Sequence, residues 1–202
     1  MDIRDRLLSA AAHVYAETGY RGATTRRIAQ EADVNEITLF RHFGSKDALI
    51  QEAIRRAARI DLTPLPENPV DPERELTDWC RARFQHLYGL RSLIRKVMGE
   101  MEEHPEIVRY AEGCPSDSGC ELYRYVERLK ACGLASSDVN AAAATTMLMG
   151  AMFAEAMSRD IMPELYKISA DESIAEYVKV FLCALGARDR GRDGAQALRS
   201  VP

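Results

Sequence analysis

Apolar residues recur at three- and four-residue steps along most of this chain, which is the spacing of one face of an α-helix. Ile3, Leu7, Ala11 and Val14 follow this spacing and predict a first amphipathic helix over residues 2–18. No run of alternating β-branched residues lies between turn signals in the sequence. The pattern therefore predicts an all-α fold.

The same spacing, read together with caps and helix breakers, places the later helices. We expect Thr25 to cap a short helix that is followed, after a turn, by a second short one, and Gly133 to end a later helix. Residues 113–119 contain several breakers and predict a loop. Apart from the second short helix, the helices expected after the first cover residues 26–32, 45–60, 73–101, 120–132, 138–159 and 171–186.

A proline-rich segment divides the chain. Residues 61–72 hold four of the eight prolines, and helix does not propagate through that spacing. We therefore predict an N-terminal domain over 1–60, a joint over 61–72 and a larger helical domain over 73–186. The last stretch, 187–202, is rich in Arg, Asp and Gly and is predicted to be disordered.

Composition is that of a soluble globular protein, with 47% hydrophobic and 29% charged residues. The net charge is −4, but it is unevenly distributed: residues 1–60 carry +2 and the remainder −6. This distribution agrees with contact to nucleic acid at one end only. We do not expect the charged N-terminus to be a secretory signal, and the uncharged run over 139–154 is shorter than the roughly 20 residues that a membrane span needs. A cytoplasmic location is expected.

The most specific stretch covers residues 24–49 and has the form of a helix-turn-helix. Ala29 is small where two helices would cross, and Asp33 falls where the turn needs a left-handed backbone. Asn35 is placed to cap the second helix. The residues expected to pack between the helices are Ile28, Val34 and Leu39.

This stretch resembles the signature of the tetracycline-repressor (TetR) family. The resemblance runs from Gly19-Tyr20 through Thr24-Thr25, Ile28-Ala29 and Ala32-Asp33-Val34 to the block 38–47, TLFRHFGSKD, and Leu49. It implies a three-helix DNA-binding domain, a larger helical effector domain and a homodimer formed through helices 138–159 and 171–186. Members of the family are mostly repressors that leave a palindromic operator when a small molecule binds. The two recognition helices of the dimer would enter major grooves ~34–36 Å apart.

The resemblance also assigns candidate DNA-binding residues. Glu36, Ile37 and Thr38 would face base edges, and the phosphates would be held by Thr25, Arg26, His42 and Lys46. Asn35 and Arg41 complete the candidate set. Phe40 departs from the family, which often has Tyr there, and it lacks the hydroxyl that could bind a phosphate.

Glu36 has two alternative roles near DNA. Its carboxylate could accept a hydrogen bond from a cytosine amino group. It could instead pair with Arg41 across the helix.

The sequence lacks the motifs of common catalytic and cofactor sites. No Gly-rich phosphate loop, HExxH motif, nucleophile elbow or paired-cysteine motif is found. The chain is therefore predicted not to be an enzyme and to hold no cofactor or metal. Among the five cysteines, Cys114 and Cys120 leave open an alternative, a redox-responsive regulator.

Methionine and aromatic residues are frequent in the C-terminal part and could line an apolar effector pocket. Ordinary core packing uses the same residue types, so each has that alternative. A protein of a different class, a helical small-molecule binding protein without operator function, also remains open. The candidate effector-binding residues are Trp79, Phe84, Tyr88, Met98, Met101, Tyr123, Met147 and Phe153.

Overall fold

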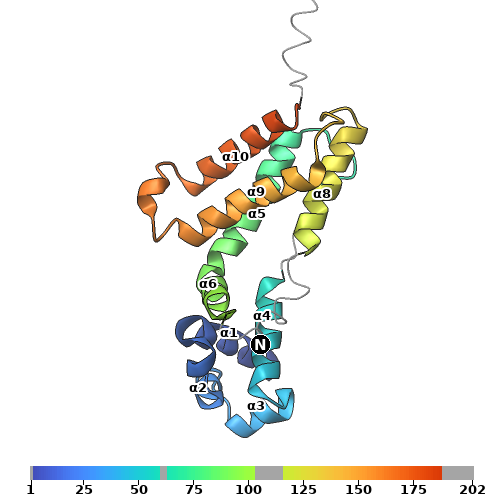
Figure 1. Ribbon diagram of the computed structural model, residues 1–202. Coiled ribbons are helices and arrows are strands. Elements are labelled where there is room, and N and C mark those ends of the chain that lie inside the picture. Colours follow the sequence, from blue (N-terminus) through green and yellow to red (C-terminus); the bar gives the residue numbers. More distant parts are fainter. Residues whose placement is uncertain (1, 60–62, 103–115, 188–202) are drawn as a thin grey trace, which may run out of the picture. The chain divides into compact units, whose positions relative to one another are not determined.

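A computed structural model describes residues 2–59, 63–102 and 116–187 of the chain (Figure 1). Every regular element in these ranges is helical, so the all-α prediction is confirmed. The helices are α1 (Ile3–Gly22), α2 (Thr25–Glu31), α3 (Glu36–Phe43), α4 (Lys46–Ala58), α5 (Pro72–Gly89), α6 (Arg91–Glu100), α8 (Ser116–Ala131), α9 (Ala141–Ser158), the 3₁₀ turn η2 (Pro163–Leu165) and α10 (Ala170–Ala184). None of the described helices is long and apolar enough to cross a bilayer.

The chain forms two compact units. The first unit comprises the described residues of 1–62 and 84–117, and the second those of 63–83 and 118–202. One boundary between the units falls in the proline-rich joint at 61–72, but a second falls within α5, because α6 packs against α1 and adds Leu93 and Val97 to the core of the first unit. The functional division into residues 1–60 and 73–186 stays a prediction, and most of the 187–202 tail lies outside the described residues.

The first unit has one core, built by α1, α2, α3, α4 and α6. Ile28 and Leu39 are fully buried in it, and Val34 packs against it, as the sequence predicted. The other large side chains that are completely buried in this core are Leu7, Tyr15, Leu49 and Ile50. Burial from five helices fixes the short α2 and α3, which are too short to be stable alone.

Side-chain caps set most helix starts in this unit. Asn35 accepts from the N–H of Ile37 at 2.9 Å, which confirms the predicted cap of α3. The predicted cap at Thr25 is wrong by one residue, because Thr24 has the extended backbone of an N-cap and accepts from the N–H of Arg27. Thr25 is thereby the first residue of α2, and its hydroxyl is available for another partner.

Three predicted boundaries in the C-terminal part differ from the structure, and one of them is the start of the helix expected over 138–159, which begins at Ala141 because Asn140 caps it. The single helix expected over 73–101 is interrupted between Gly89 and Arg91, where Leu90 has φ −93° and ψ 1°. Apolar spacing continues across that break, so periodicity alone does not show it. The loop expected over 113–119 is also corrected at its end, since α8 begins at Ser116.

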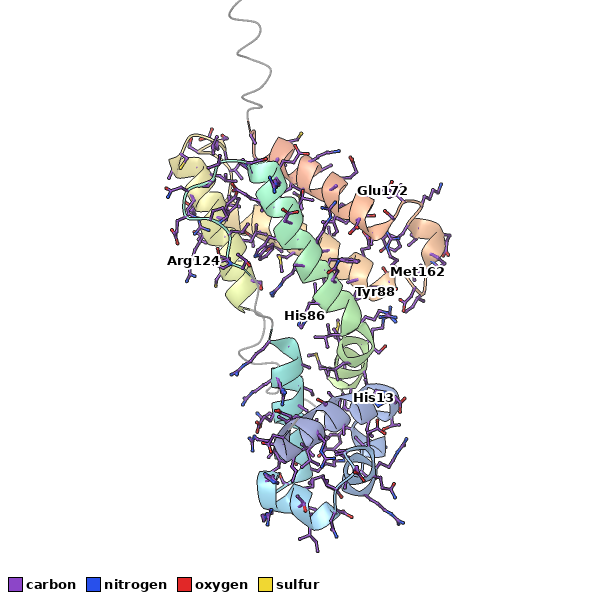
Figure 2. All side chains as sticks on the ribbon, turned by 180° about the vertical axis from the view of Figure 1, so that it is seen from behind. His13, His86, Tyr88, Arg124, Met162 and Glu172 are labelled. Carbon is purple, nitrogen blue, oxygen red and sulfur yellow. The ribbon has the colours of Figure 1, made fainter. Side chains whose placement is uncertain are left out.

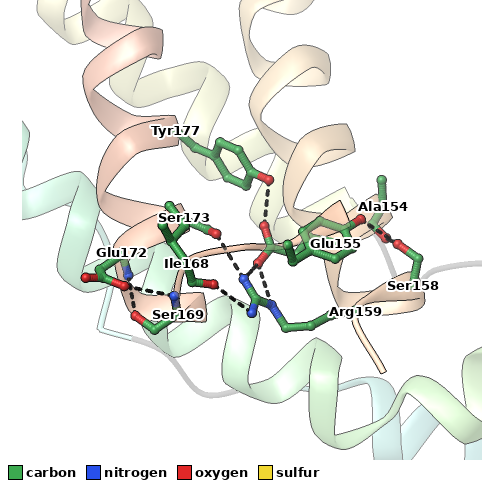
Figure 3. A network of polar contacts seen from close by, with 10 residues as sticks. Ala154, Glu155, Ser158, Arg159, Ile168, Ser169, Glu172, Ser173 and Tyr177 are labelled. Carbon is green, nitrogen blue, oxygen red and sulfur yellow. Dashed lines mark hydrogen bonds and ion pairs between the residues drawn. The ribbon is translucent and has the colours of Figure 1, made fainter. Parts of the chain in front are cut away.

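The second unit holds a buried polar network between α9 and α10 (Figure 3). The Glu155 carboxylate is 1% exposed and accepts from the Arg159 guanidinium and from the Tyr177 hydroxyl at 2.6 Å. Arg159 also donates to Ser173 and to the Ile168 carbonyl. The paired charges and their hydrogen bonds hold the connection between α9 and α10 in place.

Candidate nucleic-acid interface

The turn between α2 and α3 has the backbone of a helix-turn-helix. Asp33 lies in the left-handed region at φ 51°, as predicted from its position. The N–H of Val34 donates to the Ala29 carbonyl at 3.0 Å, which closes the turn on α2. Ala29 is buried, so a small side chain is needed where the helices meet.

The outer face of α3 presents an unusual mixture of apolar and polar side chains to solvent. Ile37 is 75% exposed and Phe40 is 46% exposed, whereas Leu39 on the opposite face is fully buried. Arg41 is also exposed, and Thr38 is half-buried. Exposed Ile and Phe side chains on a short helix gain nothing from folding, which favours a role in binding.

Glu36 is bonded to α2. The Thr25 hydroxyl donates to Oε1 of Glu36 at 2.5 Å, joining the first residues of the two helices. Of the two roles considered for Glu36, pairing with Arg41 is not what the described residues show. Hydrogen bonding to cytosine stays a prediction.

Exposed arginines lie on both α2 and α3. Arg26 and Arg41, both predicted to be near DNA, are exposed and form no ion pair with a described carboxylate. Arg27 shares these properties and was missed from the sequence, although it directly follows Arg26. His42 is half-buried beside the Phe43 ring.

Lys46 differs from a free phosphate ligand. Its Nζ donates to the Tyr20 carbonyl at 2.7 Å and lies 3.9 Å from the centroid of the Tyr20 ring. Burial lowers the pKa of Lys46, against the opposing effect of the Asp47 and Glu100 carboxylates. The ammonium group is therefore already engaged within the protein.

Comparison with known proteins agrees with this geometry. Residues 7–53 match the model of the family described as bacterial regulatory proteins, tetR family. Residues 7–53 thus form a TetR-family DNA-binding domain. TetR proteins are transcriptional regulators and not enzymes, which is the class predicted from the sequence.

Individual TetR relatives are distant. The chain is 23% identical over 124 residues to the HTH-type transcriptional regulator YvkB of Bacillus subtilis (strain 168), covering 61% of this chain and 66% of that protein. It is 32% identical over 98 residues to the HTH-type transcriptional repressor AcnR of Corynebacterium efficiens, covering 44% of this chain and 51% of that protein. The matches thus span half to two thirds of the length of these relatives.

Similarity to a solved regulator structure extends over most of the chain. The structure of the fatty acid degradation regulator FadR from Bacillus halodurans is similar with a TM-score of 0.68 and 18% identity, covering 92% of this chain and 97% of that one. The family match at residues 7–53 and this likeness of fold together confirm an N-terminal TetR helix-turn-helix with a helical C-terminal region. At this identity the likeness is one of fold.

The candidate effector-binding residues fall into both compact units. Phe84, Tyr88, Met98 and Met101 belong to the first, and Trp79, Tyr123, Met147 and Phe153 to the second. Trp79 and Phe84 are buried, and the Phe84 ring stacks on Tyr88 at 5.9 Å between centroids. Met98, Tyr123 and Met147 are exposed. Their assembly around one effector of a TetR regulator stays a prediction.

The other candidate chemistry gains no support. Cys120 is exposed, but Cys114 lies outside the described residues, so their proposed redox pairing is not tested. The residues that the structure describes contain no group of three or more His, Cys, Asp or Glu side chains that could hold a metal ion.

Proposed function

We propose that this chain is a DNA-binding transcriptional regulator that reads its operator with α3. The observation that carries the proposal is the exposed face of α3, where Ile37 and Arg41 project from a helix whose buried Leu39 anchors it to the core. An α-helix fits the major groove of B-DNA. Exposed Ile37 could contact a thymine methyl group there, and Thr38 a base edge.

Charged groups around α3 would hold the phosphates. Arg26 and Arg41 are exposed on the same unit, and Arg27 adds a third guanidinium that carries no predicted role from the family. Each neutralised phosphate releases a counterion, so operator affinity should fall steeply with salt. Residues 61–202 carry a net charge of −6, which disfavours contact with DNA there, so we place DNA binding on the helix-turn-helix.

A homodimer through helices 138–159 and 171–186 would supply the two half-sites of a palindromic operator. The support lies on α9, where Ala143, Met147, Gly150 and Ala154 are exposed and uncharged. Their spacing places them along one side of the helix, where a second helix can approach closely. The α9–α10 connection adds exposed apolar side chains, including Met162 (Figure 2).

Repression with release by a small-molecule effector is the mode of action we propose. Several relatives, AcnR among them, are named repressors. An effector can act only through unequal affinity for the DNA-competent and DNA-incompetent states. The candidate effector-binding residues of both units supply apolar and aromatic surface, and the cytoplasmic location predicted from the sequence follows from a function on DNA.

Selection of genomic fragments by the purified full chain tests the proposal. Fluorescence anisotropy on the enriched fragment, over a salt series, would give affinity and salt slope. Arg26→Ala and Arg41→Ala should each weaken binding and reduce the slope by about one, as expected for one phosphate contact. Arg74→Ala is the matched control, because Arg74 is a well exposed arginine of the second unit. No enrichment over random DNA, with protein shown to be free of bound small molecules, would overturn the proposal.

A further inference from the structure

Gly19 interrupts α1 just before its last turn. Its backbone has φ 70° and ψ −176°, which L side chains rarely adopt. A Cβ built on Gly19 would lie 2.0 Å from Oε1 of Glu100. The carboxylate at the end of α6 therefore occupies the space that a side chain at position 19 would fill.

Glu100 binds the backbone that this interruption releases. The N–H of Tyr20 donates to both carboxylate oxygens, at 3.0 and 3.1 Å, and the Tyr15 hydroxyl donates at 2.7 Å. Tyr15 is fully buried, so its hydroxyl needs a partner inside the protein. Three hydrogen bonds to one carboxylate are strong contacts, because the acceptor is charged.

The other side of Tyr20 is bound to α4. Its carbonyl accepts from Lys46, its ring lies against the same ammonium group, and its hydroxyl is bonded to Asp47. Lys46 and Asp47 are the first two residues of α4, and α3 ends shortly before them, at Phe43. One residue, Tyr20, thus joins the end of α6 to the start of the helix that follows α3, and all of these groups lie in the first unit.

We infer that Glu100 is a positioning residue for the DNA-binding surface, acting through Tyr20 on Lys46 and the start of α4. This inference rests on the proposed function. Without the carboxylate, Tyr20 loses its N–H partner, and the carbonyl and ring that hold Lys46 are no longer fixed. The segment between α3 and α4 is then no longer held in one position. Operator binding weakens as a result, although Glu100 touches no DNA.

The sign of the effect separates positioning from simple electrostatics. Removal of a negative charge from a DNA-binding unit should strengthen DNA binding if charge alone matters. Positioning requires the opposite, and we expect Glu100→Ala to weaken operator binding about tenfold, which is a change of about 1.4 kcal/mol. The salt slope should not change, because no phosphate contact is removed.

The experiment compares three variants of the full chain by anisotropy on the operator, each with a thermal melt. Glu102→Ala is the matched control: it removes the same charge two residues away, from an exposed side chain. Glu100→Gln keeps the size and one acceptor oxygen, so it should lie between wild type and Glu100→Ala and remains informative if the alanine variant does not fold. Operator affinity of Glu100→Ala and Glu100→Gln equal to or tighter than that of Glu102→Ala would overturn the inference.

Amide hydrogen exchange without DNA distinguishes the failure of this inference from that of the proposed function. In Glu100→Ala the first turn of α4 should exchange faster than in wild type and in Glu102→Ala. Faster exchange in a protein that binds no DNA would support the coupling between Glu100 and α4 but contradict the proposed function as a DNA-binding regulator. Unchanged exchange, with operator binding intact in all variants, would contradict the coupling between Glu100 and α4 and leave the proposed function standing.

Discussion

The Thr25 hydroxyl donates to the Glu36 carboxylate at 2.5 Å, and this bond joins the first residue of α2 to the first residue of α3. Both side chains were assigned to DNA from the family resemblance. The bond makes them an internal link of the helix-turn-helix as well, because it fixes the start of α3 relative to α2. A phosphate or a base could use either group only by sharing or displacing this contact.

Removing the Thr25 hydroxyl should therefore affect stability as well as DNA binding. We expect Thr25→Val to lower the free energy of unfolding by about 1 kcal/mol, the usual contribution of one such hydrogen bond. Thr25→Ser keeps the hydroxyl and should remain close to wild type. Urea denaturation followed by circular dichroism measures both, and equal stability of the Val and Ser variants would show that the bond contributes nothing.

Lys46 provides a test between two roles. The family resemblance assigns it a phosphate, whereas the structure shows its ammonium group on Tyr20. If the contact with Tyr20 is its main role, Lys46→Met weakens operator binding without changing the salt slope. A slope that falls by about one, as expected for Arg26→Ala, would instead restore the phosphate role. The two slopes are measured by the same salt titration of anisotropy.

These residues show which features the sequence could predict. Asp33 and Asn35 were placed correctly because a left-handed turn and an N-cap depend on local chemistry within a few residues. The contact of Glu100 with Tyr20 joins residues 80 positions apart, and no local pattern marks it. Gly19 directly follows the helix predicted over residues 2–18, but nothing near it in the sequence points to residue 100. The break at Leu90 was missed for a related reason, since apolar spacing is the same on both sides of it.

Replacing Glu155 should lower the free energy of unfolding more than replacing any other described carboxylate of the second unit. Its side chain is buried against Arg159 and Tyr177. Burial, and secondly the hydrogen bond to Glu155, raise the pKa of the Tyr177 hydroxyl. Glu155→Ala would leave the Arg159 guanidinium largely buried without its partner, and we expect a loss of about 3 kcal/mol in the free energy of unfolding.

Glu176→Ala is the control for this loss, because Glu176 is an exposed carboxylate of the same unit whose pairing with Lys179 lies at the surface. Its unfolding midpoint should stay close to that of wild type. Chemical denaturation of both variants decides the matter, and similar midpoints would mean that the network in Figure 3 does not stabilise the unit.

Cysteine reactivity should report both the core and the proposed dimer. Cys80 is fully buried, and burial raises the pKa of its thiol to about 12. Since the thiolate is the reactive form, Cys80 stays protonated and unreactive towards iodoacetamide at pH 8. Cys120 and Cys132 are exposed and should be alkylated readily. Peptide mass spectrometry after timed alkylation follows each site, and Cys80 modified as fast as Cys132 without denaturant would contradict its burial.

Cys183 adds a test of the assembly in the same experiment. It is exposed on α10 in the single chain, and α10 belongs to the helices proposed to form the dimer. If that face is covered by a second copy, alkylation of Cys183 slows as protein concentration rises, whereas the rate at Cys132 does not. If the alkylation rates at Cys183 and Cys132 are both independent of protein concentration, in a protein shown to be dimeric by light scattering, the interface lies away from Cys183. That result would favour the exposed face of α9.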